Sequence, residues 1–302
     1  MGEFPRSLQK TTITAEPFTI PIAEAGAGQP VLVCVNGMQQ TMAMWRSVIK
    51  RMTAAGYRTV LFDFPNQGRA AGLNRHLGAS SLSVEQQVGV LHAVVEHVAP
   101  LQRVALLGGS WGALVAAAYA AAYPDRVARL VLGSFQTRPN PKLRQVARQG
   151  RALVEMGRGA ELGELFVAEF GGGMDDARRS AVQAQLRTLG PEQYRQMYDQ
   201  ARLLVDDVDF ESIVDLQRID ARTLIVNGSD DPIVDWTQTP QTAARFRSAS
   251  FEIVAAGHFL HFERPEILDT YASFLTADAV PAVPASRDEL HLGAGANHSG
   301  QA

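Results

Sequence analysis

Short apolar runs alternate with amphipathic stretches along most of the chain. The apolar runs are rich in Val, Leu and Ile and occupy residues 31–35, 59–64, 104–107, 127–132, 223–228 and 251–254. Runs of this length and composition are typical of strands that are buried on both faces of a sheet. Stretches with helical periodicity or composition occupy residues 45–55, 84–98, 114–123 and 266–275. The alternation predicts an α/β fold in which helices cover a mostly parallel sheet.

The two ends of the chain depart from this pattern. Residues 11–23 alternate β-branched and polar side chains, with interruptions at Pro17 and Pro21, which favours edge strands. The leader at residues 1–10 is polar, and the tail at residues 277–302 is rich in Ala, Pro, Gly and Ser. We therefore expect both end segments to be disordered.

The alternation also stops in the middle of the chain, at residues 136–216. This segment is charged and mostly helical in character, and it contains no apolar strand. Residues 144–157 and 191–205 predict amphipathic helices, and Gly171 to Gly173 form a flexible break between them. We expect a helical cap inserted over one edge of the sheet, with residues 11–135 and 217–276 forming the core. A helical extension that makes dimer contacts is the alternative.

A Gly-x-Ser-x-Gly motif follows the apolar run at residues 104–107 and precedes the alanine-rich helical stretch. A serine in a sharp strand-to-helix turn has a strained backbone, and small residues must flank it because strand and helix crowd together. Gly108 and Gly112 meet this need around Ser110. We therefore expect Ser110 to be the nucleophile of a serine enzyme; the alternative is a glycine-rich turn without a catalytic role.

An acid and a base follow later strands of the predicted sheet. The run at residues 223–228 leads into Ser-Asp-Asp-Pro, where a carboxylate can orient a histidine. Asp231, which a proline and two apolar residues follow, is the predicted acid, and Asp230 is the alternative. His258 follows the last strand, and the glycine before it lets the loop bring the imidazole across to the serine. His261 is the competing base, but it lacks that glycine. Ser110, Asp231 and His258 thus predict a catalytic triad in which the histidine takes the serine proton.

Backbone groups for an oxyanion hole are expected near the carboxyl end of the run at residues 31–35. Asn36 and Gly37 follow this run, and a glycine there lets the backbone turn toward a substrate carbonyl. We expect the N–H groups of Met38 and Trp111 to stabilise the tetrahedral oxyanion. An ordinary Asn-Gly turn is the alternative.

Composition narrows the class of partners. The 302 residues are 46% hydrophobic with a formal net charge of −3, which gives no reason to expect nucleic acid or an anionic membrane as partner. No stretch approaches the roughly 18 apolar residues of a membrane span, and the N-terminus lacks the pattern of a signal peptide. The single cysteine, Cys34, lies in an apolar run, which indicates a buried thiol and a reducing, cytoplasmic location. The predicted chemistry needs no metal or cofactor, and no His, Cys and Asp cluster has metal-ligand spacing.

The motifs together resemble the α/β-hydrolase superfamily over residues 18–276. The resemblance rests on Asn36-Gly37, on residues 63–68, on the motif at 108–112, on Asp231 and on Gly257-His258. It implies an eight-stranded, mostly parallel sheet with a helical cap, and the order nucleophile, acid, histidine agrees with it. Dehalogenases and epoxide hydrolases of this fold use an aspartate nucleophile, so Ser110 argues against both.

Two subgroups of the superfamily look similar to this sequence. The Gly-Gly-Ser-Trp-Gly segment at 108–112, which forms the turn around the nucleophile (the elbow), resembles that of the proline iminopeptidases. Those peptidases, however, carry His-Gly-Gly-Pro-Gly where residues 36–40 here read Asn-Gly-Met-Gln-Gln. The bacterial 3-hydroxyacyl transferases, which make a rhamnolipid precursor or exchange acyl groups between carrier protein and CoA, are similar at 35–37, 60–63, 110–112, 226–231 and 257–260. Asn66 and Ala70 depart from the superfamily's usual Gly and Ser.

The second resemblance implies fatty 3-hydroxyacyl chemistry with an acyl-enzyme at Ser110. The small-molecule substrate would be an acyl ester or thioester, on carrier protein or CoA, and the acceptor a hydroxyl, a thiol or water. A plain carboxylesterase or thioesterase, a peptidase, and a non-catalytic ligand-binding module remain alternatives. A C–C bond hydrolase or a cofactor-free perhydrolase would keep the same triad, and the oligomeric state stays open.

Overall fold

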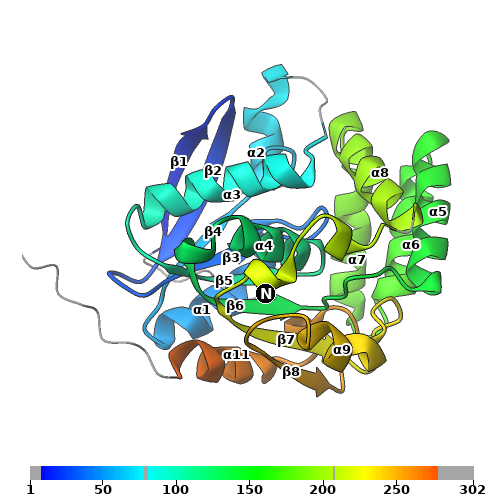
Figure 1. Ribbon diagram of the computed structural model, residues 1–302. Coiled ribbons are helices and arrows are strands. Elements are labelled where there is room, and N and C mark those ends of the chain that lie inside the picture. Colours follow the sequence, from blue (N-terminus) through cyan, green and yellow to red (C-terminus); the bar gives the residue numbers. More distant parts are fainter. Residues whose placement is uncertain (1–7, 78–80, 207, 278–302) are drawn as a thin grey trace, which may run out of the picture.

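An eight-stranded sheet forms the centre of the molecule in the computed structural model, which describes residues 8–77, 81–206 and 208–277 (Figure 1). Its strands are β1 (Gln9–Ala15), β2 (Phe18–Ala25), β3 (Val31–Val35), β4 (Arg58–Phe62), β5 (Val104–Gly109), β6 (Val127–Gly133), β7 (Arg222–Gly228) and β8 (Ala249–Val254). They lie in the order β1-β2-β4-β3-β5-β6-β7-β8, and all neighbours from β4 to β8 are parallel. The six predicted apolar runs are these six parallel strands, so the predicted α/β class is confirmed.

Helices cover both faces of the sheet and explain why the central parallel strands are mainly apolar. Helices α3 (Val84–Val98) and α4 (Trp111–Ala122) pack on one face, and α1 (Arg46–Ala54) and α11 (Ile267–Thr276) pack on the other. Ser83 caps α3 with a capping box, in which its hydroxyl accepts the N–H of Gln86. With a helix layer on each side, the residues of β3 to β7 are almost all buried, whereas β8, at the edge of the sheet, is partly exposed.

The first two strands partly correct the sequence interpretation. β1 pairs antiparallel with β2 and is an edge strand, but β2 also pairs antiparallel with β4 through residues 22–25. Pro21 lies just before this paired part, so its missing N–H costs no bond to β4. β1 includes Gln9 and Lys10, so the expectation of disorder is wrong for these two residues. The rest of the predicted leader and nearly all of the predicted tail, residues 1–7 and 278–302, lie outside the described residues.

Four helices between β6 and β7 form a layer beside the carboxyl ends of the strands (Figure 1). They are α5 (Pro141–Glu155), α6 (Gly159–Phe170), α7 (Asp176–Arg187) and α8 (Pro191–Val205), and we call them the helical insertion. The sequence predicts two helices here, within α5 and at α8, and the Gly171 to Gly173 break that separates α6 from α7. For residues 159–170 and 176–187 it predicts helical character without helix bounds, and the structure places α6 and α7 there.

Shorter elements connect these layers. The short helices are α2 (Gly68–Leu73), α9 (Thr239–Ala243) and α10 (Leu260–Glu263), with 3-10 turns at Met42–Trp45, Arg75–Leu77, Pro124–Arg126, Phe210–Ser212, Leu216–Arg218 and Trp236–Gln238. None of the helices in the described part of the chain is long and apolar enough to cross a lipid bilayer.

Candidate active site

Ser110 occupies the sharp turn between β5 and α4. Its backbone has φ 54° and ψ −123°, a combination that costs an L-residue about 1–3 kcal/mol. A Cβ on Gly108 would lie 2.4 Å from the carbonyl oxygen of Gly112, and a Cβ on Gly112 would lie 2.1 Å from that of Val35. Both flanking positions therefore require glycine, because a side chain at either one would overlap neighbouring backbone atoms. The turn holds the Ser110 hydroxyl above the carboxyl ends of the central strands.

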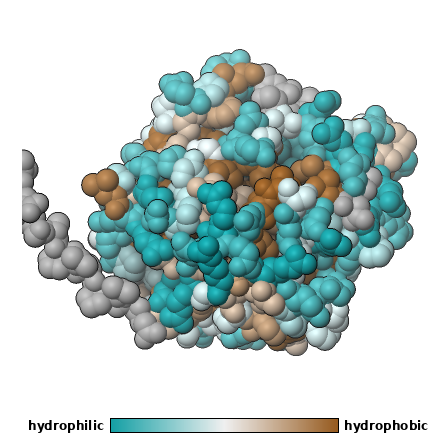
Figure 2. Space-filling model, viewed as in Figure 1, coloured by the Kyte–Doolittle hydropathy of each residue, from teal (hydrophilic) through white to brown (hydrophobic). Residues whose placement is uncertain are grey.

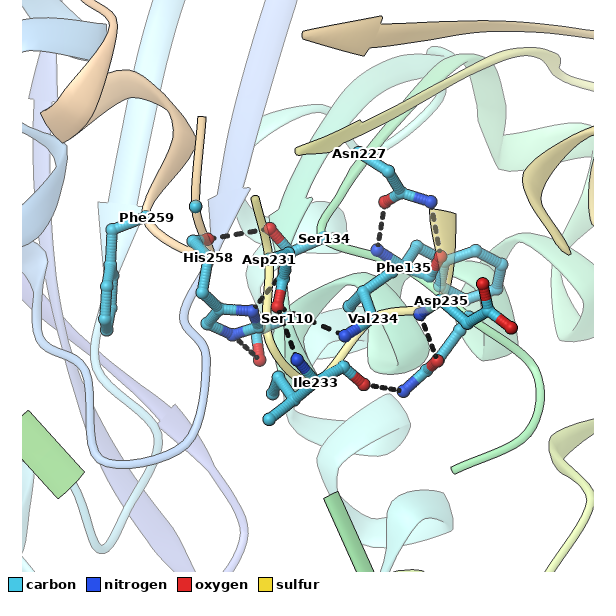
Figure 3. Close-up of polar contacts among 12 residues, drawn as sticks. Ser110, Ser134, Phe135, Asn227, Asp231, Ile233, Val234, Asp235, His258 and Phe259 are labelled. Carbon is cyan, nitrogen blue, oxygen red and sulfur yellow. Dashed lines mark hydrogen bonds and ion pairs between the residues drawn. The ribbon is translucent and has the colours of Figure 1, made fainter. Parts of the chain in front are cut away.

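Asp231 lies in the loop after β7 with its carboxylate buried. One oxygen, Oδ1, accepts the N–H groups of Ile233 at 3.0 Å and Val234 at 3.1 Å, and Oδ2 lies 2.7 Å from Nδ1 of His258 (Figure 3). Burial alone would raise the pKa of Asp231, but the facing imidazole and these hydrogen bonds hold it below its ordinary value. Asp231 therefore stays ionised near neutral pH. The alternative acid, Asp230, is exposed.

His258 lies in the loop after β8 and joins the other two side chains. Its Nε2 lies 2.9 Å from Oγ of Ser110, on the opposite side of the ring from Asp231 (Figure 3). The Ser134 hydroxyl donates a 2.7 Å hydrogen bond to the His258 carbonyl, which fixes the loop against the end of β6. The ring of Phe170, from the helical insertion, packs edge-on against the imidazole at 5.3 Å between centroids. The three predicted side chains thus form one hydrogen-bonded chain from three separate loops.

The competing histidine, His261, lies elsewhere on α10. Its ring stacks on Trp45 with 5.6 Å between centroids, and its Nε2 is buried without a hydrogen-bond partner among the described residues. Burial lowers the pKa of His261 to about 4. An imidazole in this setting is a neutral packing group, and the structure pairs Asp231 with His258 instead.

The loop after β3 is held by a buried amide network. Asn36 donates to the carbonyl of Phe62, to Asp63 and to Gln67, and its own oxygen accepts the indole N–H of Trp45 at 2.7 Å. Asp63 also accepts the backbone N–H groups of residues 42 and 69, so it holds two loops in place. Burial raises the pKa of Asp63, although these hydrogen bonds oppose the shift. The network holds the loop that carries Met38 against the ends of β3 and β4.

Within this loop, Gly37 accepts hydrogen bonds from the backbone of Gln40 and the side chain of Gln67, at 3.2 and 2.9 Å. This is the turn that the Asn-Gly dipeptide alone would predict, and it positions Met38 beside the serine. Met38 and Trp111 both line the cavity above Ser110. No acceptor for the Met38 N–H occurs among the described residues, and Trp111 begins α4, where N–H groups lack partners within the helix.

Two side chains to which the sequence motifs assign no role support the loop that carries Asp231. Asn227, at the end of β7, exchanges two hydrogen bonds with the backbone of Phe135, at 2.8 and 2.9 Å. Gln136 donates to the carbonyl of Ile233 and accepts the N–H of Asp235, on both sides of the turn that follows Asp231 (Figure 3). The signal for Asn227 was its place at a strand end within the motif at residues 226–231. Gln136 carried no signal, because its partners lie about a hundred residues away.

A cavity of about 120 Å³ opens above Ser110 and His258, between the core and the helical insertion. Its walls are mainly apolar and include Leu143, Phe166, Phe170, Leu203, Phe210 and Ile233. Figure 2 shows apolar side chains gathered at this boundary between core and insertion. Among the described residues, no Asp, Glu, Lys or Arg side chain lines it. The described residues also contain no group of three or more His, Cys, Asp or Glu side chains placed to hold a metal ion.

Known proteins with similar sequences and structures identify the family of this chain. The profile described as "alpha/beta hydrolase fold" matches residues 30–265. A 2-hydroxy-6-oxononadienedioate/2-hydroxy-6-oxononatrienedioate hydrolase of Paraburkholderia phymatum is 32% identical over 112 residues, which are 36% of this chain and 37% of that protein. The hydrolase of the same name from Paraburkholderia xenovorans is 26% identical over 269 residues, covering 80% of this chain and 85% of that protein.

The chain spans less than two fifths of the length of the first curated relatives that it matches. Among solved structures, a hydrolase from Pseudomonas aeruginosa superimposes with a TM-score of 0.74 at 21% identity, over 90% of this chain and 99% of that chain. Identity at this level shows a shared fold. Since the family profile extends over most of the sequence and the fold agrees, the chain belongs to the α/β hydrolase fold family.

Proposed function

We propose that this protein is a serine hydrolase that cleaves esters or thioesters of apolar acyl groups through an acyl-enzyme. The observation that carries the proposal is the chain of hydrogen bonds from Ser110 through His258 to Asp231, at 2.9 and 2.7 Å, at the base of an apolar cavity. A nucleophile, a base in reach and a group that orients the base are what covalent catalysis at a carbonyl requires.

The first half of the reaction would form the acyl-enzyme. Ser110 Oγ attacks the substrate carbonyl while Nε2 of His258 takes the hydroxyl proton, and Asp231 stabilises the imidazolium. The N–H groups of Met38 and Trp111 donate to the oxyanion of the tetrahedral intermediate. The intermediate then collapses, and the leaving alcohol or thiol takes the proton from His258.

The second half would release the acid. A water molecule gives a proton to His258 as it attacks the acyl carbonyl. The second intermediate then breaks its bond to Ser110 Oγ, which takes the proton back from His258 as the acid leaves. The helical insertion would act as a cap in both halves, because its side chains cover the imidazole and form much of the cavity wall. Such cover strengthens the electrostatic contacts inside the site.

The apolar wall of the cavity favours a substrate whose acyl group carries no charge. The two curated relatives described above are named for dioates, which carry two carboxylates, whereas the described walls of this cavity offer no Lys or Arg to pair with one. A carboxylate buried there would lose its hydration without compensation. A peptide substrate with a charged amino terminus meets the same difficulty, because no described carboxylate lines the cavity.

Acyl transfer is the second candidate function. The sequence resemblance to the 3-hydroxyacyl transferases supports it, and an apolar cavity suits a fatty acyl group delivered on CoA or carrier protein. Hydrolysis and transfer differ only in whether water or another nucleophile reaches the acyl-enzyme. A binding module without catalysis would not need the aligned serine and imidazole.

A product screen by mass spectrometry tests these functions. Wild type and Ser110→Ala receive nitrophenyl esters of graded chain length, 3-hydroxyacyl thioesters on CoA and carrier protein, and proline-terminated peptides. Free acid from the esters or thioesters that disappears in the variant supports the hydrolase. A swapped thioester or an ester dimer would establish transfer instead. Equal turnover by both proteins would exclude Ser110 as the nucleophile.

A further inference from the structure

A second cavity, of about 80 Å³, lies inside the helical insertion between α5, α6 and α8. Its walls are almost wholly apolar and include Val146, Val154, Leu162, Leu165, Met197 and Ala201. An apolar cavity of this kind does not hold ordered water, because it offers too few hydrogen-bond partners. It is therefore available to an apolar group.

This cavity shares one wall with the cavity above Ser110. Five residues line both: Met38, Leu143, Phe166, Phe170 and Leu204. Phe166 and Phe170 stack at 4.4 Å between centroids, and the second ring also meets the imidazole of His258. The wall therefore runs from the catalytic histidine to the interior of the insertion.

Small residues keep the second cavity open. Ala147 and Gly150 on α5 and Ala201 on α8 line it, where larger residues would fill it. A Cβ on Gly150 would meet Leu162 at 3.5 Å, an ordinary contact, so neither backbone conformation nor crowding demands glycine at this position. Gly150 thus adds volume to the second cavity, and its lack of a side chain is not needed for a turn.

A polar pair borders the same cavity. Arg151 donates from Nη2 to the hydroxyl of Tyr198 at 2.8 Å, and its guanidinium carbon lies 4.4 Å from the centroid of that ring. Both residues line the cavity. An apolar chain gains nothing by extending past this pair, so the pair limits the apolar length that the cavity can bury.

From these contacts we infer that the second cavity is a subsite for the distal part of the acyl chain. The inference rests on the proposed function and makes it specific: the preferred substrates carry unbranched acyl chains that outgrow the first cavity and pass the Phe166–Phe170 pair. Each methylene moved from water into an apolar site favours binding roughly fourfold. Preference for longer chains should therefore depend on the free volume beside Ala147.

The test is a chain-length series with two matched variants of one helix. Ala147→Leu adds volume inside the second cavity, whereas Ala152→Leu makes the same substitution at an exposed position on α5. The measurement is kcat/KM for nitrophenyl acetate, butyrate, octanoate and dodecanoate. We expect Ala147→Leu to lower the ratio of dodecanoate to acetate kcat/KM at least tenfold and Ala152→Leu to leave it at the wild-type value. An unchanged ratio in Ala147→Leu would overturn the subsite.

Two further measurements separate a failed subsite from a failed function or a misfolded variant. Gly150→Val fills the same space from the next turn of α5 and should shift the ratio in the same direction. If wild type hydrolyses no ester of any length, calorimetric titration with 1-decanol and 1-butanol tests the subsite without turnover. Weaker decanol binding by Ala147→Leu with unchanged butanol binding would keep the subsite, and equal decanol binding would refute it.

Discussion

The side-chain amide of Gln185, on α7, donates a 2.7 Å hydrogen bond to the backbone carbonyl of Gln39. Gln39 has φ 52°, which is unfavourable for a residue with a Cβ, and its own amide donates to the carbonyl of Gln193 on α8 at 3.3 Å. The helical insertion is thus tied at two points to the residue that follows Met38. Because the Met38 N–H is proposed to bind the oxyanion, the position of the insertion and the shape of the oxyanion hole are linked.

Gln185→Ala should lower kcat with little change in KM, because a misplaced Met38 N–H weakens the transition state more than the bound ester. Loss of a well-placed oxyanion donor costs about 100-fold to 1000-fold, and a displaced donor should cost part of that. The measurement is steady-state kinetics on a short-chain nitrophenyl ester, with Gln183→Ala on the same helix as control. An increase in KM alone would show that Gln185 shapes the cavity instead.

Asp231→Asn should lower turnover by about 10,000-fold with the fold retained, because the amide favours the wrong imidazole tautomer. Asp230→Asn, one residue earlier and exposed, should be nearly silent. Turnover of a nitrophenyl ester, together with circular dichroism spectra of both variants, checks the pair. The reverse result would move the acid to Asp230.

The buried His261 should make the protein less stable in acid. Its pKa of about 4 lies below the value of 6.5 expected in an unfolded chain. From pH 6.5 down to 4, the unfolded chain takes up a proton that the folded protein does not, so the free energy of unfolding falls with pH. His261→Phe, which preserves an aromatic contact with Trp45, should flatten this part of the curve in denaturant titrations at pH 7 and pH 4.5.

Exposed His76 supplies the control, since His76→Gln should leave the same slope as wild type. His261→Phe should also keep ester turnover at neutral pH, because His258 is the base in the proposed mechanism. Loss of turnover in a folded His261→Phe protein would contradict that assignment.

Two of the three glycines in the elbow, Gly109 and Gly112, should respond differently to substitution by alanine. A Cβ on Gly112 would lie 2.1 Å from the Val35 carbonyl oxygen, so Gly112→Ala must displace β3 or α4 and should lower the free energy of unfolding by about 2 kcal/mol or more. The nearest atom to a Cβ on Gly109 is 3.8 Å away, on Trp45, so Gly109→Ala should stay within about 1 kcal/mol of wild type. Equal losses in denaturant unfolding would contradict the crowding argument.

The sequence by itself determined the core of this protein. Strands β3 to β8 were predicted because each contains a mainly apolar run. Burial on both faces demands such a run in β3 to β7, whereas β8 lies at the edge of the sheet and is partly exposed. The Ser110 turn was predicted from the local order of strand, Gly-x-Ser-x-Gly motif and helix, and the crowding of Gly108 arises within this segment. Gly112 is crowded instead by Val35 and Asn36, which only the fold brings beside it. Asp231 and His258 followed from their places after two strands, because parallel strands end at one edge of the sheet.

Only the tertiary structure decided which groups meet across that edge. Asp231 rather than Asp230 faces His258 because the turn at Ile233 and Val234 orients one carboxylate inward. The hydrogen bonds that join Gln39 to Gln185 and Gln193 connect segments more than a hundred residues apart. The second cavity beside Ala147 forms only where α5, α6 and α8 pack together. The period of apolar residues along the chain shows which face of a helix or strand is buried. It does not show which side chains pack against that face, because those come from segments that are distant in the sequence.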